Sequence, residues 1–258
     1  MSHELNSWGF IRAGVASPEL RVADIDFNTR QIISTLSNLA DQGCQLAVFP
    51  ELCLTGYTCG DLFYQSLLLE QAAEAAIKTA QAAQQSKIAA VIGLPLKVSG
   101  RLYNCALFTC GGEILGAVPK TYLPTTNEFY EERWFTPAYH ATHDHVEFGN
   151  LTVPFGTDLL FSAENHPQLT LGIEICEDLW GVHPLSGEMA LAGATVLVNP
   201  SASNELLGKA EYRHELVKHQ SARCLAAYLY ASAGPGESTT DLVCSGHSLI
   251  AENGVILS

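Results

Sequence analysis

Hydrophobic and polar positions along the chain switch repeatedly between the helical and the strand period, which predicts mixed helices and strands from end to end. Asp26 can cap a helix whose apolar face repeats at helical spacing, and Gly43 can end that helix. The apolar positions of this face are Ile32, Ile33, Leu36 and Leu39. We expect a buried strand, an Ala-rich helix and three further strands to follow, at 45–52, 70–86, 88–96, 102–110 and 114–120.

The second half of the chain continues the alternation. Over 168–176 the pattern has period two, which predicts a strand with Glu174 and Cys176 on the face opposite to its apolar residues. Those apolar residues are Leu169, Leu171, Ile173 and Ile175. We then expect a helix and a strand, a long helix and a strand, and a hairpin that turns at Glu252-Asn253-Gly254, within 187–202, 208–233 and 247–258.

This order of elements favours two sheets packed face to face, with helices on the outside. A doubly wound single sheet is the alternative that the pattern alone leaves open. The length of 258 residues is enough for a sizeable core in one large domain or in two.

Composition narrows the possible partners. With 13 basic and 27 acidic residues the net charge is −14, which argues against binding to nucleic acid or to anionic membranes. We find no signal peptide, no apolar run long enough to span a membrane and no Cys-x-x-Cys pair, so we expect a cytoplasmic protein with reduced thiols. His140, His143 and His145 have metal-like spacing, but they lie in a polar, irregular segment, and we expect no metal site.

Three strand ends carry a polar residue, namely Glu51, Lys120 and Cys176. Taken singly each has an ordinary explanation, as a cap or turn residue, a solvated lysine and a buried thiol. Taken together they fit nucleophilic amide cleavage through a thioester, with Glu51 as general base for the Cys176 thiol.

The acidic neighbours of Cys176 need an explanation, because Glu174, Glu177 and Asp178 should each raise the pKa of the thiol. We expect the Lys120 ammonium to offset these carboxylates and to favour the thiolate.

The blocks FPE, PKTYLP and EICEDLW contain these three residues and resemble the Glu–Lys–Cys signature of the nitrilase (carbon–nitrogen hydrolase) superfamily. The resemblance implies a four-layer αββα sandwich. It also implies that Glu51 is the general base, that Lys120 stabilises thiolate and oxyanion, and that Cys176 is the nucleophile. Glu128, eight residues after Lys120, falls where the superfamily keeps a second glutamate that helps to position lysine and substrate.

A finer resemblance covers essentially the whole chain. The blocks LTGYTCGDLF, LPTTNEFYEERWF, NPSASN and AGPGESTTDL are similar to those of the glutaminase domains of bacterial glutamine-dependent NAD synthetases. The resemblance implies that residues 1–258 form one glutaminase domain, which hydrolyses L-glutamine and passes ammonia to a C-terminal, ATP-dependent synthetase domain of the same polypeptide for amidation of deamido-NAD. That second domain is absent from this sequence. We expect no cofactor in the present domain, ATP and magnesium only in the missing one, and a homo-oligomer.

The resemblance also assigns seven positions to glutamine binding. They are Tyr57, Phe129, Glu131, Glu177, Trp180, Ser203 and Lys209. In chemical terms Glu131 and Glu177 can attract the substrate ammonium, and Lys209 can meet its carboxylate. The aromatic residues of this set can equally be ordinary core residues, and Glu131 can belong to a solvated helix face. The functions that compete with the glutaminase are a stand-alone amidase of the same superfamily and a catalytically silent assembly module.

Overall fold

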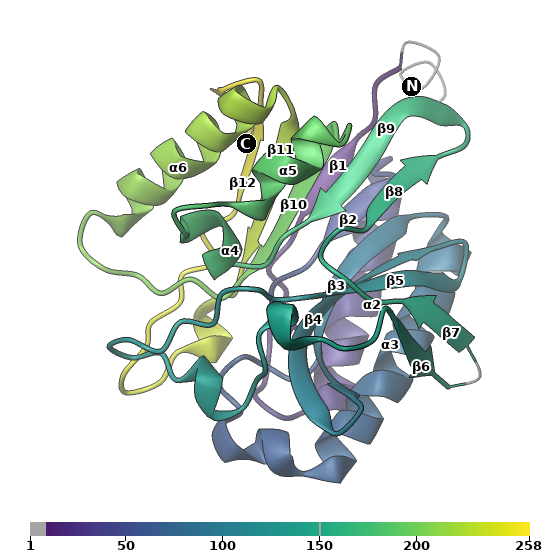
Figure 1. Ribbon diagram of the computed structural model, residues 1–258. Coiled ribbons are helices and arrows are strands. Elements are labelled where there is room, and N and C mark those ends of the chain that lie inside the picture. The colour runs from purple at the N-terminus through teal and green to yellow at the C-terminus, as the bar shows by residue number, and fades with distance from the viewer. Residues whose placement is uncertain (1–8, 150) are drawn as a thin grey trace.

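Two β-sheets face each other at the centre of the molecule (Figure 1), in a computed structural model that describes residues 9–149 and 151–258. The first sheet has the strand order β1, β2, β3, β4 and β5, with bounds Ala13–Val15, Leu46–Val48, Ala89–Val98, Arg101–Cys110 and Glu113–Pro119. Strands β1 to β3 are parallel, and β4 and β5 continue the sheet in antiparallel pairing.

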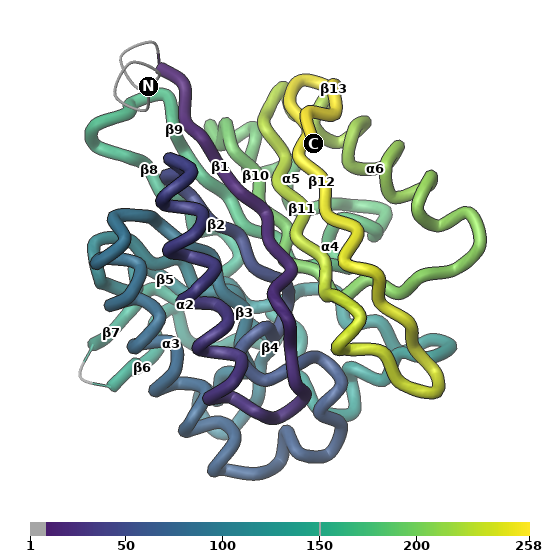
Figure 2. The backbone as a smooth tube through the Cα atoms, turned by 180° about the vertical axis from the view of Figure 1, so that it is seen from behind, coloured from purple at the N-terminus to yellow at the C-terminus, as the bar shows by residue number. Residues whose placement is uncertain are grey.

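The second sheet has the order β13, β12, β11, β10, β9 and β8. These strands are Val255–Ile256, Leu249–Glu252, Ala227–Ser232, Val196–Ser201, His166–Ile173 and Leu160–Ala163. Its three central strands, β9 to β11, are parallel. A separate hairpin of β6 (His145–Phe148) and β7 (Leu151–Pro154) packs beside β5. Seen from behind, β1 of the first sheet runs beside β11 of the second (Figure 2).

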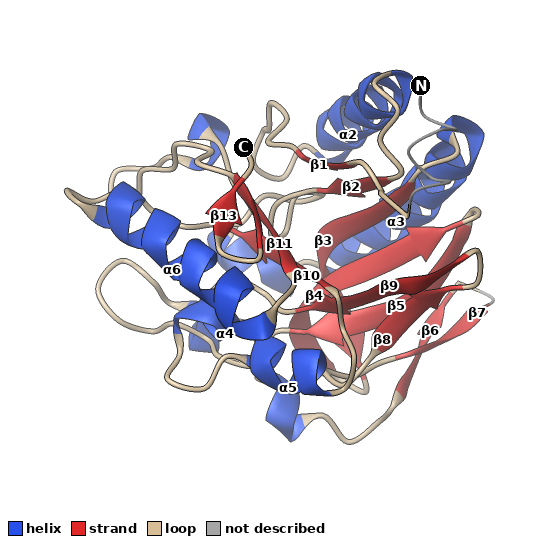
Figure 3. Ribbon diagram, turned by 90° about the horizontal axis from the view of Figure 1, so that it is seen from above, coloured by secondary structure: helices blue, strands red, loops and turns tan. Residues whose placement is uncertain are grey.

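Helices cover the outer face of each sheet, as the view along the layers shows (Figure 3). Helices α2 (Ile25–Asp41) and α3 (Ser66–Ser86) lie on the first sheet, and α5 (Leu185–Leu191) and α6 (Lys209–Cys224) on the second. The remaining helical pieces are short and lie in connections: η1 (Gly60–Tyr64), η2 (Glu131–Arg133), η3 (Ala138–His140), α4 (Glu177–Trp180) and η4 (Pro235–Glu237). The expected αββα sandwich is confirmed, and the single doubly wound sheet is excluded.

Three apolar layers hold the sandwich together, one between the sheets and one under each pair of helices. The layer between the sheets contains side chains from both, including Val48, Val91, Ile173, Val198 and Leu229, each at most 1% exposed. Burial of such side chains contributes about 1.5–3 kcal/mol each. The two sheets are thereby fixed to each other, and so are the strand ends that carry polar residues.

Several local predictions need correction. The first long helix is capped by Asp24 and not by Asp26, since Asp24 Oδ1 accepts a hydrogen bond of 3.0 Å from the Phe27 amide. The short strands β1 and β8 and the hairpin of β6 and β7 were not predicted. The segment of the three histidines therefore contains regular secondary structure: His140 is the last residue of η3, and His145 is the first residue of β6.

The strand predicted over 168–176 begins and ends earlier, at His166 and Ile173. Glu174 points away from the space between the sheets, as expected, and accepts hydrogen bonds from the Tyr228 hydroxyl and the Ser186 amide. Cys176, however, does not continue the alternation, because its backbone has a positive φ and its side chain joins the layer between the sheets.

Candidate active site

Glu51 lies on a sharp turn that follows β2, and the turn packs directly onto β3. Leu52 has a positive φ of 51°, and the turn rests on Gly93. A Cβ at Gly93 would lie 2.3 Å from the Leu52 nitrogen and 2.9 Å from the Glu51 carbonyl carbon, which leaves no room for any side chain. This close approach of two backbones explains why a glycine interrupts the otherwise apolar strand.

The Glu51 carboxylate is fully buried and accepts three hydrogen bonds. Its Oε1 accepts from Lys120 Nζ at 2.5 Å and from Asn104 Nδ2 at 2.6 Å, and its Oε2 accepts from the Ala202 amide at 2.9 Å. Lys120 comes from the end of β5, Asn104 from the middle of β4 and Ala202 from the end of β10. The carboxylate thus joins both sheets, and only its Oε2 keeps a free position for one more proton donor.

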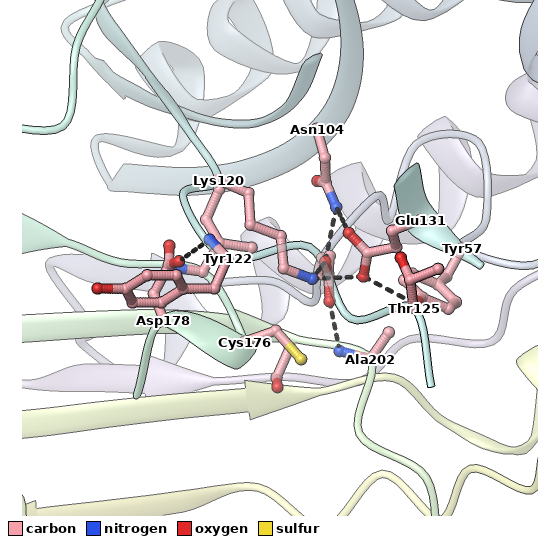
Figure 4. Close-up of polar contacts among 12 residues, drawn as sticks. Tyr57, Asn104, Lys120, Tyr122, Thr125, Glu131, Cys176, Asp178 and Ala202 are labelled. Atoms are coloured by element: carbon pink, nitrogen blue, oxygen red, sulfur yellow. Dashed lines mark hydrogen bonds and ion pairs between the residues drawn. The ribbon is translucent and has the colours of Figure 1, made fainter. Parts of the chain in front are cut away.

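Glu131, and not Glu128, is the second glutamate against Lys120. Glu131 Oε1 lies 2.5 Å from Lys120 Nζ and accepts a 2.8 Å hydrogen bond from the Tyr57 hydroxyl; Glu131 and Lys120 are buried, and Tyr57 is partly buried (Figure 4). Glu128 is instead partly exposed, and its Oε1 accepts from Asn204 Nδ2. The η2 turn explains the exchange, because it begins at Glu131 and directs that side chain inward. Its partners also leave Glu131 little capacity for a substrate ammonium.

Cys176 occupies a sharp bend between β9 and α4, with φ of 47° and ψ of −102°. Its amide donates to the Pro200 carbonyl and to Asn199 Oδ1, both at 3.0 Å, and the Asn199 amide group donates back to the Cys176 carbonyl at 3.4 Å. A positive φ is strained for a non-glycine residue and persists only where the surroundings fix it, as Asn199 does here. The bend places Cys176 beside Lys120 and Ala202 (Figure 4).

The electrostatics of Cys176 differ from our expectation. Burial and the Glu51 carboxylate raise the pKa of the thiol well above its usual range, and Lys120 offsets only part of this increase. The physical reason is that two buried carboxylates, Glu51 and Glu131, already neutralise the Lys120 ammonium. At neutral pH Cys176 is therefore a thiol that needs a base, and not a standing thiolate.

Two of the acidic neighbours of Cys176, Glu174 and Asp178, have structural roles. Asp178 is buried and accepts hydrogen bonds from the amides of Thr121, Tyr122 and Ile175, so it ties the Lys120 strand end to the cysteine bend. Burial raises the pKa of Asp178 to about 8 in spite of these donors. Glu177 is half-buried, and burial raises its pKa as well.

Most of the residues predicted to bind glutamine gather around Lys209, at the start of α6. Lys209 Nζ lies 5.0 Å from the centre of the Trp180 ring and 6.0 Å from that of Phe129, within the range of cation–π contacts, and donates to Asn204 Oδ1. Phe129 in turn packs edge-on against Tyr57. A pocket of about 260 Å³ opens beside Tyr57, and neither Lys209 nor Cys176 is among the residues that line it. Its lining includes Tyr57, Glu128, Tyr130, Trp134, Asp241 and Leu242.

Arg213 fixes the loop that carries Ser203. Although charged, Arg213 is fully buried in α6, and its guanidinium donates to Ser203 Oγ at 3.1 Å, to the Asn204 carbonyl at 3.0 Å and to Glu205 Oε1 at 2.6 Å. A buried arginine with this many acceptors holds the loop in one conformation. Ser203 itself is buried, and the contact with Arg213 fixes its position.

Several polar residues that hold the site together were not predicted: Asn104, Asn199, Asn204, Arg213 and Glu237. Asn104 and Asn199 gave a usable signal, because an amide within an apolar strand is buried and must find partners. Asn204, Arg213 and Glu237 lie in polar segments, where nothing in the sequence distinguishes a buried residue from a solvated one.

Within residues 9–149 and 151–258, no three His, Cys, Asp or Glu side chains are placed to hold a metal ion together. His140, His143 and His145 are exposed, and His145 pairs with Asp144 at 3.0 Å. All eight cysteines are free thiols. In the same described ranges, no helix is both long and apolar enough to cross a lipid bilayer.

The chain belongs to the carbon-nitrogen hydrolase family, whose model matches residues 12–258. A glutamine-dependent NAD(+) synthetase of Mycobacterium leprae is 44% identical over 252 residues, which are 98% of this chain and 37% of that protein. The human protein of that name is 28% identical over 91% of this chain and 34% of its own length. The chain therefore spans little more than a third of the curated relatives that it matches.

Solved structures agree with the sequence matches. The crystal structure of a glutamine-dependent NAD(+) synthetase from Cytophaga hutchinsonii superposes with a TM-score of 0.86 at 31% identity, over 96% of this chain and 40% of that chain. A Nesterenkonia amidase of the nitrilase superfamily superposes with a TM-score of 0.76 at 19% identity, over 96% of this chain and 85% of that one. The second likeness concerns the fold alone.

Proposed function

We propose that this domain is a glutaminase that hydrolyses the side-chain amide of L-glutamine through a thioester on Cys176. The observation that carries the proposal is the buried Glu51–Lys120 pair beside Cys176, together with the cationic and aromatic cluster of Lys209, Trp180 and Phe129. The first feature is suited to amide cleavage, and the second to a small zwitterionic substrate. The similarity to glutamine-dependent NAD synthetases over nearly the whole chain supports glutamine as that substrate.

Proton transfer follows from the hydrogen bonds of Glu51. Lys120 and Asn104 occupy Oε1, so Oε2 is the oxygen that takes the Cys176 proton as sulfur attacks the amide carbon. Protonated Glu51 then gives this proton to the leaving nitrogen, and ammonia departs. A water molecule attacks the thioester, Glu51 accepts its proton, and glutamate leaves as the sulfur recovers a proton.

Lys120 stabilises the negative charge that develops on the substrate oxygen. Its two carboxylate partners keep it protonated, because they raise the pKa of the ammonium well above its usual value in spite of burial. The lysine therefore acts as a fixed cation throughout the reaction and does not itself transfer a proton.

The positions of Glu128, Glu131 and Glu177 change the prediction of how the substrate is recognised. Lys209 can pair with the α-carboxylate of glutamine, while Glu177 and Glu128 can attract its α-ammonium. Glu128 thus takes the role that we had expected for Glu131, since Glu131 is engaged by Lys120 and Tyr57. Tyr57, Phe129 and Trp180 line the aliphatic part of the substrate. The Ser203 hydroxyl can hydrogen-bond to one of its polar groups.

The relatives named as NAD synthetases also support a role for the released ammonia. We propose that it is delivered to an ATP-dependent synthetase domain of the same polypeptide, which amidates deamido-NAD. In this proposal ATP and magnesium belong to that second domain, the assembled enzyme is a cytoplasmic homo-oligomer, and the present domain needs no cofactor of its own.

Ammonia release tests the proposal, with glutamine, asparagine and a simple aliphatic nitrile as parallel substrates. We expect turnover with glutamine and little with the other two. Cys176→Ala should abolish it, whereas Cys110→Ala, a change at an exposed thiol, should not. A preference for the nitrile or a simple amide would favour a stand-alone hydrolase, and no turnover of any substrate would favour a silent module.

A further inference from the structure

Glu237 is a buried carboxylate at the edge of the site to which the proposed chemistry gives no role. It ends η4, is 1% exposed and accepts three hydrogen bonds from the segment that carries Tyr57. Its Oε1 accepts from the Tyr57 amide at 2.5 Å, and its Oε2 accepts from the Thr58 amide at 3.0 Å and the Thr58 hydroxyl at 2.8 Å. Two backbone donors and a hydroxyl, all directed at one carboxylate, form a rigid anchor.

Neither side of this anchor has room to move. A Cβ at Gly236 would lie 2.4 Å from the Leu20 carbonyl oxygen, so η4 packs directly on that backbone. On the other side Gly56 has a φ of 92°, and a Cβ there would lie 3.3 Å from Glu237 Oε1. The Glu237 carboxylate therefore fixes the position of the Tyr57 backbone.

Tyr57 connects this anchor to the buried charges. Its hydroxyl donates to Glu131 Oε1, the same oxygen that lies 2.5 Å from Lys120 Nζ (Figure 4). A hydroxyl at the end of a rigid ring follows its backbone, so a small displacement of the Tyr57 main chain lengthens this hydrogen bond. The contacts run without a break from Glu237 through Tyr57 and Glu131 to Lys120.

We propose that Glu237 is a positioning residue, which holds the Tyr57 hydroxyl on Glu131 and so keeps Glu131 ionised against Lys120. The inference deepens the proposed glutaminase function and rests on it for its kinetic consequences. The anchor itself is a property of the fold and can be tested without turnover.

The expected pH effect has a definite sign. Glu131 is faced by Lys120, Glu51, Tyr57 and the Asn104 amide group, which lies 3.5 Å from its Oε2. Burial raises the pKa of Glu131, and the hydrogen bond from Tyr57 opposes that rise because it favours the charged form. Loss of the bond should raise the pKa further, and the acid limb of the kcat profile should move to higher pH by about one unit.

The experiment compares Tyr57→Phe, Glu237→Gln and the double variant, by pH profiles of glutamine hydrolysis and by hydrogen exchange of the peptide that contains Tyr57 and Thr58. Both single variants should shift the acid limb in the same direction, and the double variant should shift it no further than Tyr57→Phe. Faster exchange is expected in Glu237→Gln. Glu205→Gln is the matched control, because the Glu205 carboxylate pairs with Arg213, takes no part in the contacts from Glu237 to Lys120 and should leave the acid limb in place.

The outcomes separate this inference from the proposed function. Faster exchange with an unmoved acid limb, or additive shifts in the double variant, would overturn the positioning role. Unchanged exchange would overturn the anchor. If Glu237→Gln does not fold, Glu237→Asp withdraws the carboxylate by one methylene and is measured in the same way. A wild-type domain without any glutaminase activity would instead overturn the proposed function, and hydrogen exchange would still decide the anchor.

Discussion

The two lysines of the site show how differently its inner and outer regions are built. Lys120 is 1% exposed and lies between two buried carboxylates at 2.5 Å, whereas Lys209 is half-buried and rests on the aromatic rings of Trp180 and Phe129. The inner region is a fixed array of charges that satisfy one another. The outer region keeps charges incompletely paired, as a pocket must if a charged substrate is to complete the pairing.

The largest expected difference comes from removal of each lysine. Lys120→Ala leaves Glu51 and Glu131 as buried charges without a cation, so we expect unfolding free energy to fall by about 3–5 kcal/mol. Activity should fall by at least about 10²–10³, because the oxyanion loses its cation. Lys209→Ala should cost below about 1 kcal/mol and act mainly on KM. Urea unfolding and steady-state kinetics measure both; equal losses of stability would contradict the distinction between the two regions.

Glu51→Gln should separate two properties of Cys176 that usually change together. Turnover should fall by about 10²–10⁴, since the general base is lost. Alkylation of Cys176 by iodoacetamide at neutral pH should become faster, because Glu51 raises the pKa of the thiol and its neutralisation increases the thiolate fraction. Peptide mapping after alkylation gives the rate at Cys176, with exposed Cys110 as an internal reference. Slower alkylation would contradict the assigned electrostatics.

Glu131 should make stability and activity depend on pH in opposite directions. Burial raises its pKa in the folded state above the value in the unfolded chain, about 4.3. Its contribution to stability is therefore fully present below the unfolded pKa of about 4.3 and is lost as the pH rises through the pKa of the folded state. Activity needs the ionised form and should increase over the same interval. The measurement is urea unfolding of wild type and Glu131→Gln from pH 4.5 to 8, and a pH-independent difference would refute the shift.

The residues of the inner region were largely predictable from sequence, and so were those that gather around Lys209 in the outer region. Glu51, Lys120 and Cys176 each end an apolar strand, and strand ends of a sandwich have fixed places, so their proximity follows from the fold. The family resemblance then supplied their roles. The details that failed depend on turns: Cys176 leaves the strand alternation through a positive φ, and a short helical turn decides which glutamate of 128–132 faces inward.

Glu128, Glu131 and Glu132 lie in one short segment and differ mainly in their surroundings. Substitution of Glu128 is the prediction with the smallest expected effect. Glu128 is partly exposed and contacts Asn204 beside the pocket, and Glu132 is exposed. We expect Glu128→Gln to raise KM for glutamine by about 3–30-fold, the effect of one weakened charge-assisted contact, with kcat nearly unchanged. Its stability should stay within about 0.5 kcal/mol of wild type, as for most surface changes. Glu132→Gln, the matched control, should alter neither quantity. A fall in kcat for Glu128→Gln as large as that for Glu131→Gln would return Glu128 to the inner region, and the exchange of roles between the two residues would be wrong.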